Sequence, residues 1–438
     1  MPKLIADMKN IYGIVDVGTQ QIRVLIGQRD ERDGRVSVLG AGVAPAEGID
    51  DRGVANIERA VASMERALQQ AMQQSGTVLR RVWVSLHHVE LRGEWSQGVI
   101  TFPQPDHEIR YEDLERLRQQ AAQRPVPADM ELIHVIPQTY HLDHRRDVRD
   151  PIGMSGVRLE GQFYLLYAPQ TILHTLRRCF QRIGVEVEGF VSRALLAAEV
   201  FLSPGHKASG VGLVYLGTHA TAVVLYAQGV LRHFAVLPLG GHLVTQDIRE
   251  VLRFILPQQA EVLKLQQGVA LASLVDPEEV LRLRLPGVPE PVEVRRRILS
   301  EVIQARLEEI FVFVAREIEK AGLLKHLYGG IYLAGGGAAM PGIEKLVEYV
   351  LGERVFRVAV GEIIGRGIVE PLLHPQMAGA VATLSLVPTL REFLPPLPPP
   401  PEYKTTAKEP SAPTPSKLME RLRSMLEKSF KLPQDLVD

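Results

Sequence analysis

The sequence predicts a mixed α/β fold in which two related lobes enclose a cleft. The segment VDVGTQQIRVLIG at residues 15–27 aligns without a gap with VYLGTHATAVVLY at residues 214–226. Each copy reads as an apolar strand, a Gly-Thr turn and a second apolar strand, and a third strand follows both. Two such hairpins at the start of two halves of similar size indicate an internal duplication. The chain has 438 residues, 46% of them hydrophobic, which is enough core material for about two or more domains.

Composition and charge exclude several classes of protein. Lys and Arg total 50 against 51 Asp and Glu, so no bulk positive charge attracts nucleic acid, and we expect no nucleic-acid partner. The single cysteine, Cys179, rules out an intramolecular disulfide framework and suits a reducing compartment. No apolar run reaches the roughly 18 residues that a membrane-spanning helix needs, and the N-terminus lacks a secretory signal pattern. We therefore expect a cytosolic protein that meets a membrane only at its surface.

The first lobe is predicted to alternate strands and helices. Strands are expected at residues 11–18, 22–28, 35–42 and 82–86, the first three as an antiparallel meander. A helix is predicted over residues 56–74, where apolar residues recur at helical spacing, and Gly76 ends it. Those apolar residues are Ile57, Val61, Met64, Leu68 and Met72. Two more helices are predicted at residues 171–183 and 192–202.

Between these parts lies an inserted subdomain at residues 87–168. Short strands (QGVITF, ELIHVIPQTY and GQFYLLYA) alternate there with one polar helix around RYEDLERLRQQAAQ. This pattern predicts a small α+β unit. A break is predicted at Ser203-Pro204-Gly205, immediately before the second copy of the hairpin.

Three glycine-containing loops are candidates for phosphate binding. A hairpin turn with Gly and a hydroxyl presents N–H and O–H groups together, as a phosphate oxygen requires. Asp16 precedes the first turn, where it could hold a hydrated Mg²⁺. In IYLAGGGAAMPGI, the glycines at 335–337 follow an apolar strand and precede a helix, which allows a ligand to approach the backbone closely. Each loop alone would be an ordinary tight turn, but three in this order favour a nucleotide site.

These motifs resemble those of a known superfamily. Asp16-Val-Gly-Thr19, Gly217-Thr218 and Ala334-Gly-Gly-Gly337 look like the two phosphate motifs and the adenosine motif of the actin/Hsp70/sugar-kinase ATPases. Within that superfamily, LIHVIPQTYHLD (132–143) and DPIGMSGVRLEGQFYLL (150–166) resemble the FtsA family of bacterial cell-division proteins. GIDDRGVANIERAVASMERAL, AEVLKLQQGVALAS and ILSEVIQARLEEIF are similar to the same family. The resemblance covers residues 12–389 and the last helix, and it implies an actin-like ATPase fold.

By this resemblance, ATP and Mg²⁺ are the expected ligands. The implied nucleotide site consists of Asp16, Gly18, Thr19, Gly217, Thr218, Glu261, Lys264, Gly335, Gly336 and Gly337. Asp16 would face Mg²⁺ through water, and Glu261 and Lys264 would face the ribose and adenine. Without the family, Glu261 and Lys264 would be a solvated pair one helical turn apart. The resemblance further implies that Arg306, with Arg297 of the basic run before it, receives the C-terminal tail of the tubulin-like division protein FtsZ.

The second phosphate motif departs from the superfamily pattern. Tyr215 aligns with Asp16, and Thr218 and His219 stand where the superfamily has further glycines. A tyrosine cannot replace a carboxylate that holds Mg²⁺-bound water. The helix in VSRALLAAEVF also offers no evident carboxylate where chaperone relatives place one for hydrolysis. We therefore predict ATP binding with weak or no ATPase activity.

The C-terminal region predicts a spacer followed by a membrane-binding helix. Nine of the 22 residues at 395–416 are Pro, which favours an extended linker over residues 395–415. An amphipathic helix and tail are predicted at 416–438. Between residues 417 and 431, five basic and two acidic residues give a net charge of +3, which favours an anionic membrane surface. The predicted membrane contacts are Leu418, Met419, Leu422, Met425, Leu426 and Phe430, flanked by Lys417, Arg421 and Arg423.

Two other partners remain possible for this helix, the body of the protein itself and a helix of another protein. The long spacer argues against docking onto the body. FtsA relatives end in a linker and a membrane-targeting helix, so the resemblance favours the membrane.

The whole chain is thus predicted to divide into eight segments. The first lobe comprises 1–86 and 169–204 and is interrupted by the insertion at 87–168. The second lobe comprises 205–242 and 326–394 and is interrupted by a partner-binding subdomain at 243–325. The linker (395–415) and the membrane-targeting helix and tail (416–438) follow. We expect an actin-like protein that self-associates and anchors FtsZ to the cytoplasmic face of the membrane at the division site. The inserted subdomain would recruit later division proteins.

Two alternatives stay open at this point. One is a pilus-assembly adaptor of a related actin-like branch, which typically lacks the terminal lipid helix. The other is an active ATPase or sugar kinase, against which Tyr215 counts.

Overall fold

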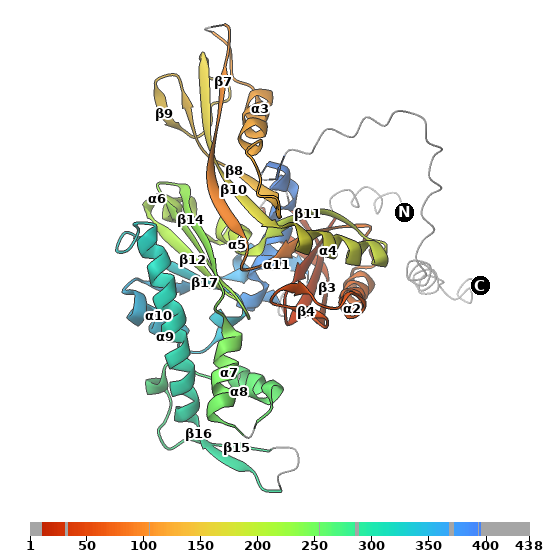
Figure 1. Cartoon of the computed structure of the whole chain (residues 1–438), viewed down its shortest axis with the longest axis vertical. Coiled ribbons are helices and arrows are strands. Elements are labelled where there is room, and N and C mark those ends of the chain that lie inside the picture. Colours follow the sequence, from red (N-terminus) through yellow and green to blue (C-terminus); the bar gives the residue numbers. More distant parts are fainter. Residues whose placement is uncertain are drawn as a thin grey trace, which may run out of the picture.

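The structure, a computed structural model, describes residues 11–395 except 31–33, 105, 254, 285–288, 368–371 and 393. The described part is elongated, with two sheet-centred lobes in the middle and a smaller unit at each end (Figure 1). The predicted linker, apart from its first residue, and the whole terminal helix lie outside the described residues. Among the helices that are described, none combines the length and apolar character needed to cross a membrane.

The first lobe is built on a six-stranded sheet of order β11-β6-β1-β2-β3-β19. Its strands are β1 (Tyr12–Val17), β2 (Gln21–Arg29), β3 (Val36–Pro45), β6 (Arg81–Leu86), β11 (Glu186–Ser192) and β19 (Ile364–Gly367). As predicted, the first three form an antiparallel meander. Parallel pairing adds β6 and β11 on one side and β19 on the other. The strands β1 and β6 are buried along nearly their whole length, which explains why they are mostly apolar rather than alternating.

Four helices pack on or beside this sheet. α2 (Ile57–Ser75) covers β2 and β3, whereas α11 (Ala378–Leu386) covers β1, β2 and β6. α4 (Gln170–Ile183) packs on β11, and α5 (Arg193–Phe201) packs on α11. Asn56 caps the start of α2, because its side chain accepts a hydrogen bond from the backbone N–H of Arg59. Gly76 ends the helix in the left-handed conformation at φ 65°.

The second lobe repeats the pattern of the first. Its sheet has the order β14-β13-β12-β17-β18, with β12 (Val211–Leu216), β13 (Thr221–Ala227), β14 (Val230–Leu237), β17 (Ile331–Ala334) and β18 (Val355–Arg357). β12 pairs antiparallel with β13 and parallel with β17, just as β1 pairs with β2 and β6. The predicted duplication is therefore confirmed. The long helix α9 (Arg296–Lys320) packs on β13 and β14, and α10 (Ile343–Leu351) packs between α9 and β18.

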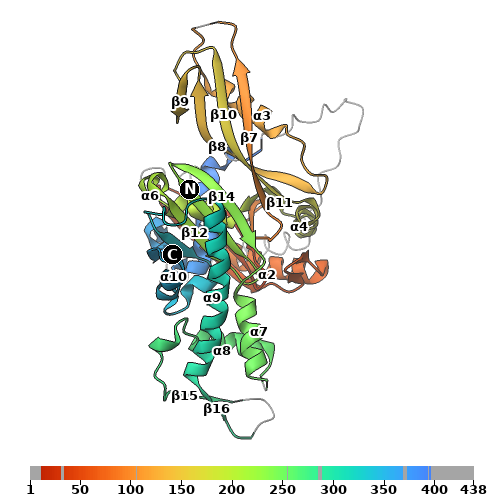
Figure 2. The ribbon, with the colours of Figure 1, turned by 60° about the vertical axis from the view of Figure 1, so that its left-hand side comes forward.

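A smaller unit stands at each end of the molecule (Figure 2). One is the inserted sheet of order β7-β10-β8-β9, formed by β7 (Arg92–Thr101), β8 (Met130–Leu142), β9 (Arg145–Val148) and β10 (Arg158–Pro169) and covered by α3 (Tyr111–Ala122). It has a hydrophobic core of its own, in which Phe163 is fully buried. At the other end, α7 (Gly241–Val251) and α8 (Pro257–Gln267) pack beside α9. A hairpin of β15 (Val280–Leu283) and β16 (Val292–Arg295) comes directly before α9 in the chain.

The structure differs from the sequence prediction in several places. The segment 326–394 was assigned to the second lobe, but its later part returns to the first, because β19 pairs with β3 and α11 packs on β1, β2 and β6. The strand β11 was not predicted, because its buried half is only the short stretch Phe190–Ser192 before α5. The break predicted at Ser203-Pro204-Gly205 is instead the start of a short helix, α6 (Pro204–Ser209). There the Ser203 side chain accepts a hydrogen bond from His206 N–H, and Pro204 occupies the first helical position.

The remaining short elements are β4 (Ile49–Asp50), β5 (Gly53–Val54) and the 3₁₀ turns η2 (Ala272–Leu274), η3 (Gly336–Ala339), η4 (Val360–Ile363), η6 (Pro375–Met377) and η7 (Val387–Glu392).

Candidate functional site

A cavity of about 550 Å³ lies between the two lobes. Its walls come from the turn between β1 and β2, the segment after β6, the turn between β12 and β13, helices α7 and α8, and the glycine-rich segment after β17. Eight predicted nucleotide residues line it: Gly18, Thr19, Gly217, Thr218, Glu261, Lys264, Gly336 and Gly337. The other two, Asp16 and Gly335, are not part of the lining. A cavity of this size is in the range that holds small ligands, typically about 300–1,000 Å³.

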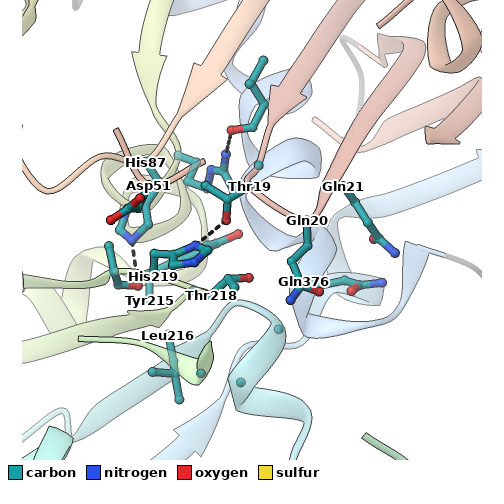
Figure 3. Close-up of a pocket in the computed structure, with 18 of the residues that line it drawn as sticks. Thr19, Gln20, Gln21, Asp51, His87, Tyr215, Leu216, Thr218, His219 and Gln376 are labelled. Carbon is teal, nitrogen blue, oxygen red and sulfur yellow. Dashed lines mark hydrogen bonds between the residues drawn. The ribbon is translucent and has the colours of Figure 1, made fainter. Parts of the chain in front are cut away.

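The two repeated turns approach the cavity from opposite lobes (Figure 3). Each turn closes with the same backbone hydrogen bond, from Gly18 N–H to Gln21 O at 3.1 Å and from Gly217 N–H to Ala220 O at 2.9 Å. A Cβ atom on Gly18 would lie 2.7 Å from that carbonyl oxygen, and one on Gly217 would lie 2.8 Å from its counterpart. Both turns therefore require glycine at this position.

A hydrogen bond joins the two turns across the cavity. The Thr19 hydroxyl oxygen lies 2.8 Å from Nδ1 of His219. The His219 ring lies 4.4 Å from the ring of His242, whose Nδ1 donates to Thr218 O at 2.9 Å. Burial, and after it the neighbouring His242, lowers the pKa of His219. His219 is thus neutral at neutral pH and holds the second turn against the first.

Asp16 lies beneath the first turn, and its carboxylate is already occupied. It is fully buried. Nη1 of Arg23 lies 3.1 Å from Oδ2, Nε of Arg193 lies 3.0 Å from Oδ1, and the Ser85 hydroxyl donates to Oδ1 at 2.6 Å. Arg23 and Arg193 line the cavity in front of it. Mg²⁺ needs accessible oxygen ligands, so these residues do not fit the ion that was predicted at Asp16. Throughout the described part of the chain, no group of three or more acidic, His or Cys side chains is arranged to hold a metal ion.

Tyr215 occupies the matching position of the second lobe. Its ring lies 5.5 Å from the ring of His87, at an interplanar angle of 51°. Burial raises the pKa of Tyr215, and the nearby Arg193 opposes that shift. The Nε2–H group of His87 donates to Ala220 O at 3.1 Å, while burial and then Arg193 lower the pKa of His87 to about 3. Both rings are therefore uncharged, and the positive charge in this part of the site belongs to the arginines.

Glu261 and Lys264 form a hydrogen-bonded network on the cavity wall. The buried ammonium group of Lys264 donates to Glu261 Oε2 at 2.7 Å, to Thr245 Oγ1 at 2.8 Å and to Gly241 O at 2.9 Å. The Thr245 hydroxyl also donates to Glu261. Burial lowers the pKa of Lys264, and the Glu261 carboxylate counteracts that shift. The pair is not the solvated pair that the sequence pattern alone indicates, and its contact with ribose and adenine remains a prediction.

The glycine-rich segment follows β17 as predicted. Gly335 has φ 89°, its N–H donates to Pro375 O at 3.1 Å, and a Cβ atom there would lie 2.4 Å from Leu216 O. Gly335 therefore shapes the loop, while Gly336 and Gly337 face the cavity. The following helix begins only at Ile343, because the turn η3 comes between.

Comparison with known proteins identifies the family. A family model described as "SHS2 domain inserted in FTSA" matches residues 89–167, and one described as "Cell division protein FtsA" matches residues 213–382. The chain is 33% identical to cell division protein FtsA of Pseudomonas aeruginosa, over 78% of this chain and 81% of that protein. The chain belongs to the FtsA family of cell division proteins. A second FtsA, from Streptococcus pneumoniae, is 34% identical over 78% of this chain and 74% of its own length.

Solved structures confirm the actin-like fold that the FtsA family implies. The PilM-PilN type IV pilus biogenesis complex contains a chain that superposes with a TM-score of 0.62 at 16% identity, covering 86% of this chain and 97% of that one. MreB5 of Spiroplasma citri bound to AMPPNP gives a TM-score of 0.52 at 11% identity, covering 88% and 98%. At such low identity these structures show the fold alone.

The predicted partner-binding arginines of this FtsA-family chain lie on α9. Nε and Nη2 of Arg306 lie 2.5 and 2.8 Å from the two carboxylate oxygens of Asp247 on α7, and Arg306 also pairs with Glu309. Arg297, nine residues earlier, is paired with Glu301 at 3.2 Å and is more exposed. Arg306 is thus engaged within the protein. The nine predicted membrane contacts between residues 417 and 430 lie outside the described residues.

The residues of the cavity that sequence reasoning missed include Arg23, His87 and Arg193. It also missed the role of His219 as a bridge between the lobes. Arg193 carries the clearest signal, because a charged side chain in the apolar run RALLAA is rarely buried unless it is paired. Arg23 lies between Ile22 and Val24 in β2, which are both buried. Neither pattern identifies Asp16 as the shared partner.

Proposed function

We propose that this FtsA-family chain binds ATP between its lobes, self-associates and anchors FtsZ to the cytoplasmic face of the membrane. One observation carries the nucleotide part of this proposal. Both repeated turns, the glycine-rich segment after β17 and the Glu261–Lys264 pair meet at one cavity, although they are far apart in the sequence. MreB5 of Spiroplasma citri, which shares the fold, was solved with AMPPNP and with ADP.

The proposed role is structural rather than catalytic. Asp16 is enclosed by two arginines, and Tyr215 stands where the second lobe would need a carboxylate. We therefore expect nucleotide binding with little or no hydrolysis. In this proposal, the nucleotide contacts both lobes, which line the cavity together, and thereby favours one arrangement of the lobes for self-association.

Three further contacts complete the proposed function. Arg306, with Arg297, would bind the C-terminal tail of FtsZ; the inserted sheet at 87–168 would recruit later division proteins; and residues 417–430 would bind an anionic membrane surface. One amphipathic helix binds a membrane weakly, but many helices on one polymer bind together, because each further attachment is effectively intramolecular. Membership of the FtsA family favours this division role over the pilus-adaptor alternative, and Tyr215 favours it over the kinase alternative.

The proposal is tested by reconstituting FtsZ filaments with liposomes that contain anionic lipid. We expect the full chain with ATP to bring FtsZ into the liposome pellet. A chain truncated after Leu394 should bind FtsZ but leave it in the supernatant, and liposomes of neutral lipid should recruit little of either protein. Equal recruitment by the truncated and full chains would contradict the membrane role of residues 417–430.

A further inference from the structure

We propose that the cavity binds the phosphates of its nucleotide through the guanidinium groups of Arg23 and Arg193, without a divalent cation. This inference rests on the proposed nucleotide binding and specifies its chemistry. It departs from the Mg²⁺-dependent site that was predicted from the motif around Asp16.

The first argument is access. The Asp16 carboxylate is fully buried and contacts Arg23, Arg193 and Ser85 at 2.6–3.1 Å. The Arg193 guanidinium is held from its other side by the carbonyl of Val17, to which Nη2 donates. Both arginine side chains line the cavity, where they are 11% and 8% exposed. A ligand in the cavity therefore meets guanidinium groups at the place where an actin-like site would present a carboxylate to a hydrated ion.

The second argument is position relative to the first turn. The point at which a Cβ atom on Gly18 would lie is 3.8 Å from Nη1 of Arg193 and 3.8 Å from Nη1 of Arg23. Both guanidinium groups thus lie beside the Gly18 turn, although one comes from β2 and the other from the start of α5. A planar guanidinium fork matches the geometry of phosphate oxygens and can donate two hydrogen bonds at once.

The third argument is charge. Two guanidinium groups and the Asp16 carboxylate leave one net positive charge beside the turn. A divalent cation held by one carboxylate would leave the same net charge, so the arginine pair can replace it electrostatically. Tyr215 and His87, which border this cluster, contribute no charge, because burial raises the pKa of Tyr215 and lowers that of His87. A partly buried net positive charge of this kind favours an anionic ligand.

The experiment is equilibrium binding of ATP to the full chain, measured calorimetrically in excess Mg²⁺ and in excess EDTA. We expect dissociation constants that agree within about twofold, which is well below the roughly tenfold change that 1.4 kcal/mol produces. Affinity that falls about tenfold or more in EDTA would overturn this inference and leave nucleotide binding intact. Absence of binding in both buffers would overturn the proposed nucleotide function as well.

Variants assign the effect to the arginines. Arg193→Leu should weaken ATP binding in EDTA by about tenfold or more, because a charge-assisted contact contributes roughly 1.5–3 kcal/mol. Mg²⁺ should then restore part of the affinity, since one side of Asp16 becomes free. Arg193→Lys should retain binding in EDTA better than Arg193→Leu. Arg177→Leu is the matched control, because Arg177 pairs with Glu131 outside the cavity.

A variant that fails to fold is recognised by its circular dichroism and thermal unfolding, and Arg23→Leu then serves the same test from β2. Full affinity of Arg193→Leu and Arg23→Leu in EDTA would overturn the assignment.

Discussion

Thr19 and His219 lie 200 positions apart in the chain, yet the Thr19 hydroxyl oxygen is 2.8 Å from Nδ1 of His219. Each belongs to one of the two repeated turns. In the aligned repeats, Thr19 matches Thr218, and His219 matches Gln20. The contact therefore does not follow the symmetry of the duplication, and it arises because the second turn carries a side chain that is long enough to reach the first lobe.

Replacing His219 with Ala should loosen the cavity. The loss of one partly buried hydrogen bond costs about 0.5–1.5 kcal/mol, so states in which the two turns separate should become more populated by roughly two- to tenfold. We expect faster amide hydrogen exchange at residues 18–21 and 217–220. Thr19→Ser, which retains a hydroxyl, is the control and should exchange much like the unaltered chain. Unchanged exchange in His219→Ala would mean that this bond does not hold the lobes together.

His87 should make stability depend on pH. Its pKa is about 3 in the folded protein and about 6.5 when unfolded, because burial and Arg193 disfavour the charged ring. As pH falls below 6.5, the unfolded chain takes up this proton first, so the stability that His87 provides is lost progressively towards pH 3. The loss amounts to about 1.4 kcal/mol per pH unit in that window.

The test compares urea unfolding of the unaltered chain and His87→Gln at about pH 7.5 and 5.5. Between these values the unaltered chain should lose about 1 kcal/mol more unfolding free energy than the variant. Gln keeps a side-chain donor for Ala220 O but has no titratable ring. The same pH dependence in both proteins would show that His87 does not titrate as its burial implies.

The repeated hairpins could be predicted from the sequence because they depend on local chemistry. An apolar strand, a Gly-Thr turn and a second apolar strand fold into a hairpin in either lobe, and the equal turn length keeps the two registers alike. The glycine-rich loop was predictable for the same reason, since Gly335 needs its positive φ whatever surrounds it. That all three loops would meet at one cavity followed from the family resemblance, because local patterns do not place distant segments together.

The arginine pair could not be predicted, because it depends on tertiary packing. The pattern around Asp16 indicates a phosphate motif, but the carboxylate meets Arg193 only after α5 has packed against α11, β12 and β13. A charged residue such as Arg193 within an apolar helix indicates that its side chain has a buried partner. The sequence alone does not show which of the chain's many carboxylates is that partner. Strand β11 was missed for a related reason, since an edge strand with alternating acidic residues lacks the apolar run of the inner strands.

Lys264→Met should weaken binding of ATP but not of inorganic tripolyphosphate. The Glu261–Lys264 pair lies on α8, whereas the repeated turns and the arginines form the phosphate side of the cavity. We expect ATP affinity to fall about tenfold, since the variant leaves the partly buried Glu261 carboxylate without its charged partner. Lys320→Met is the control, because Lys320 forms an equivalent pair with Glu317 but is exposed and outside the cavity. Equal losses for both ligands would place Lys264 on the phosphate side.

Phe163→Ala should destabilise the inserted sheet without changing ATP affinity. Phe163 is fully buried in a core formed by the inserted residues themselves, and truncation of a buried Phe costs about 3–5 kcal/mol. Limited proteolysis should then cut within residues 87–168 while calorimetry finds unchanged nucleotide binding. Tyr111→Ala, at a side chain that is 57% exposed, should leave both properties unaltered. Loss of ATP affinity in Phe163→Ala would mean that the insertion and the cavity fold as one unit.

Asp247 should compete with FtsZ for Arg306. The guanidinium of Arg306 is bound at two points by the Asp247 carboxylate, so a carboxylate of the FtsZ tail can pair with it only by displacing Asp247. Asp247→Asn removes the charge of this competitor and should tighten binding of an FtsZ tail peptide by about threefold or more. Arg306→Ala should weaken the same binding by about tenfold, as expected for a lost charge-assisted contact.

The direction in which Asp247→Asn changes peptide binding distinguishes competition for Arg306 from a purely structural role of the Arg306–Asp247 pair. If Arg306 only holds α9 against α7, removing either partner should reduce peptide binding or leave it unchanged, and neither variant should increase it. Arg316→Ala is the control, because Arg316 lies on the same helix and stacks on Phe313. Fluorescence anisotropy of a labelled tail peptide measures all three variants. Opposite effects of Asp247→Asn and Arg306→Ala would place the FtsZ contact at Arg306, since only a competing carboxylate at that guanidinium can produce them.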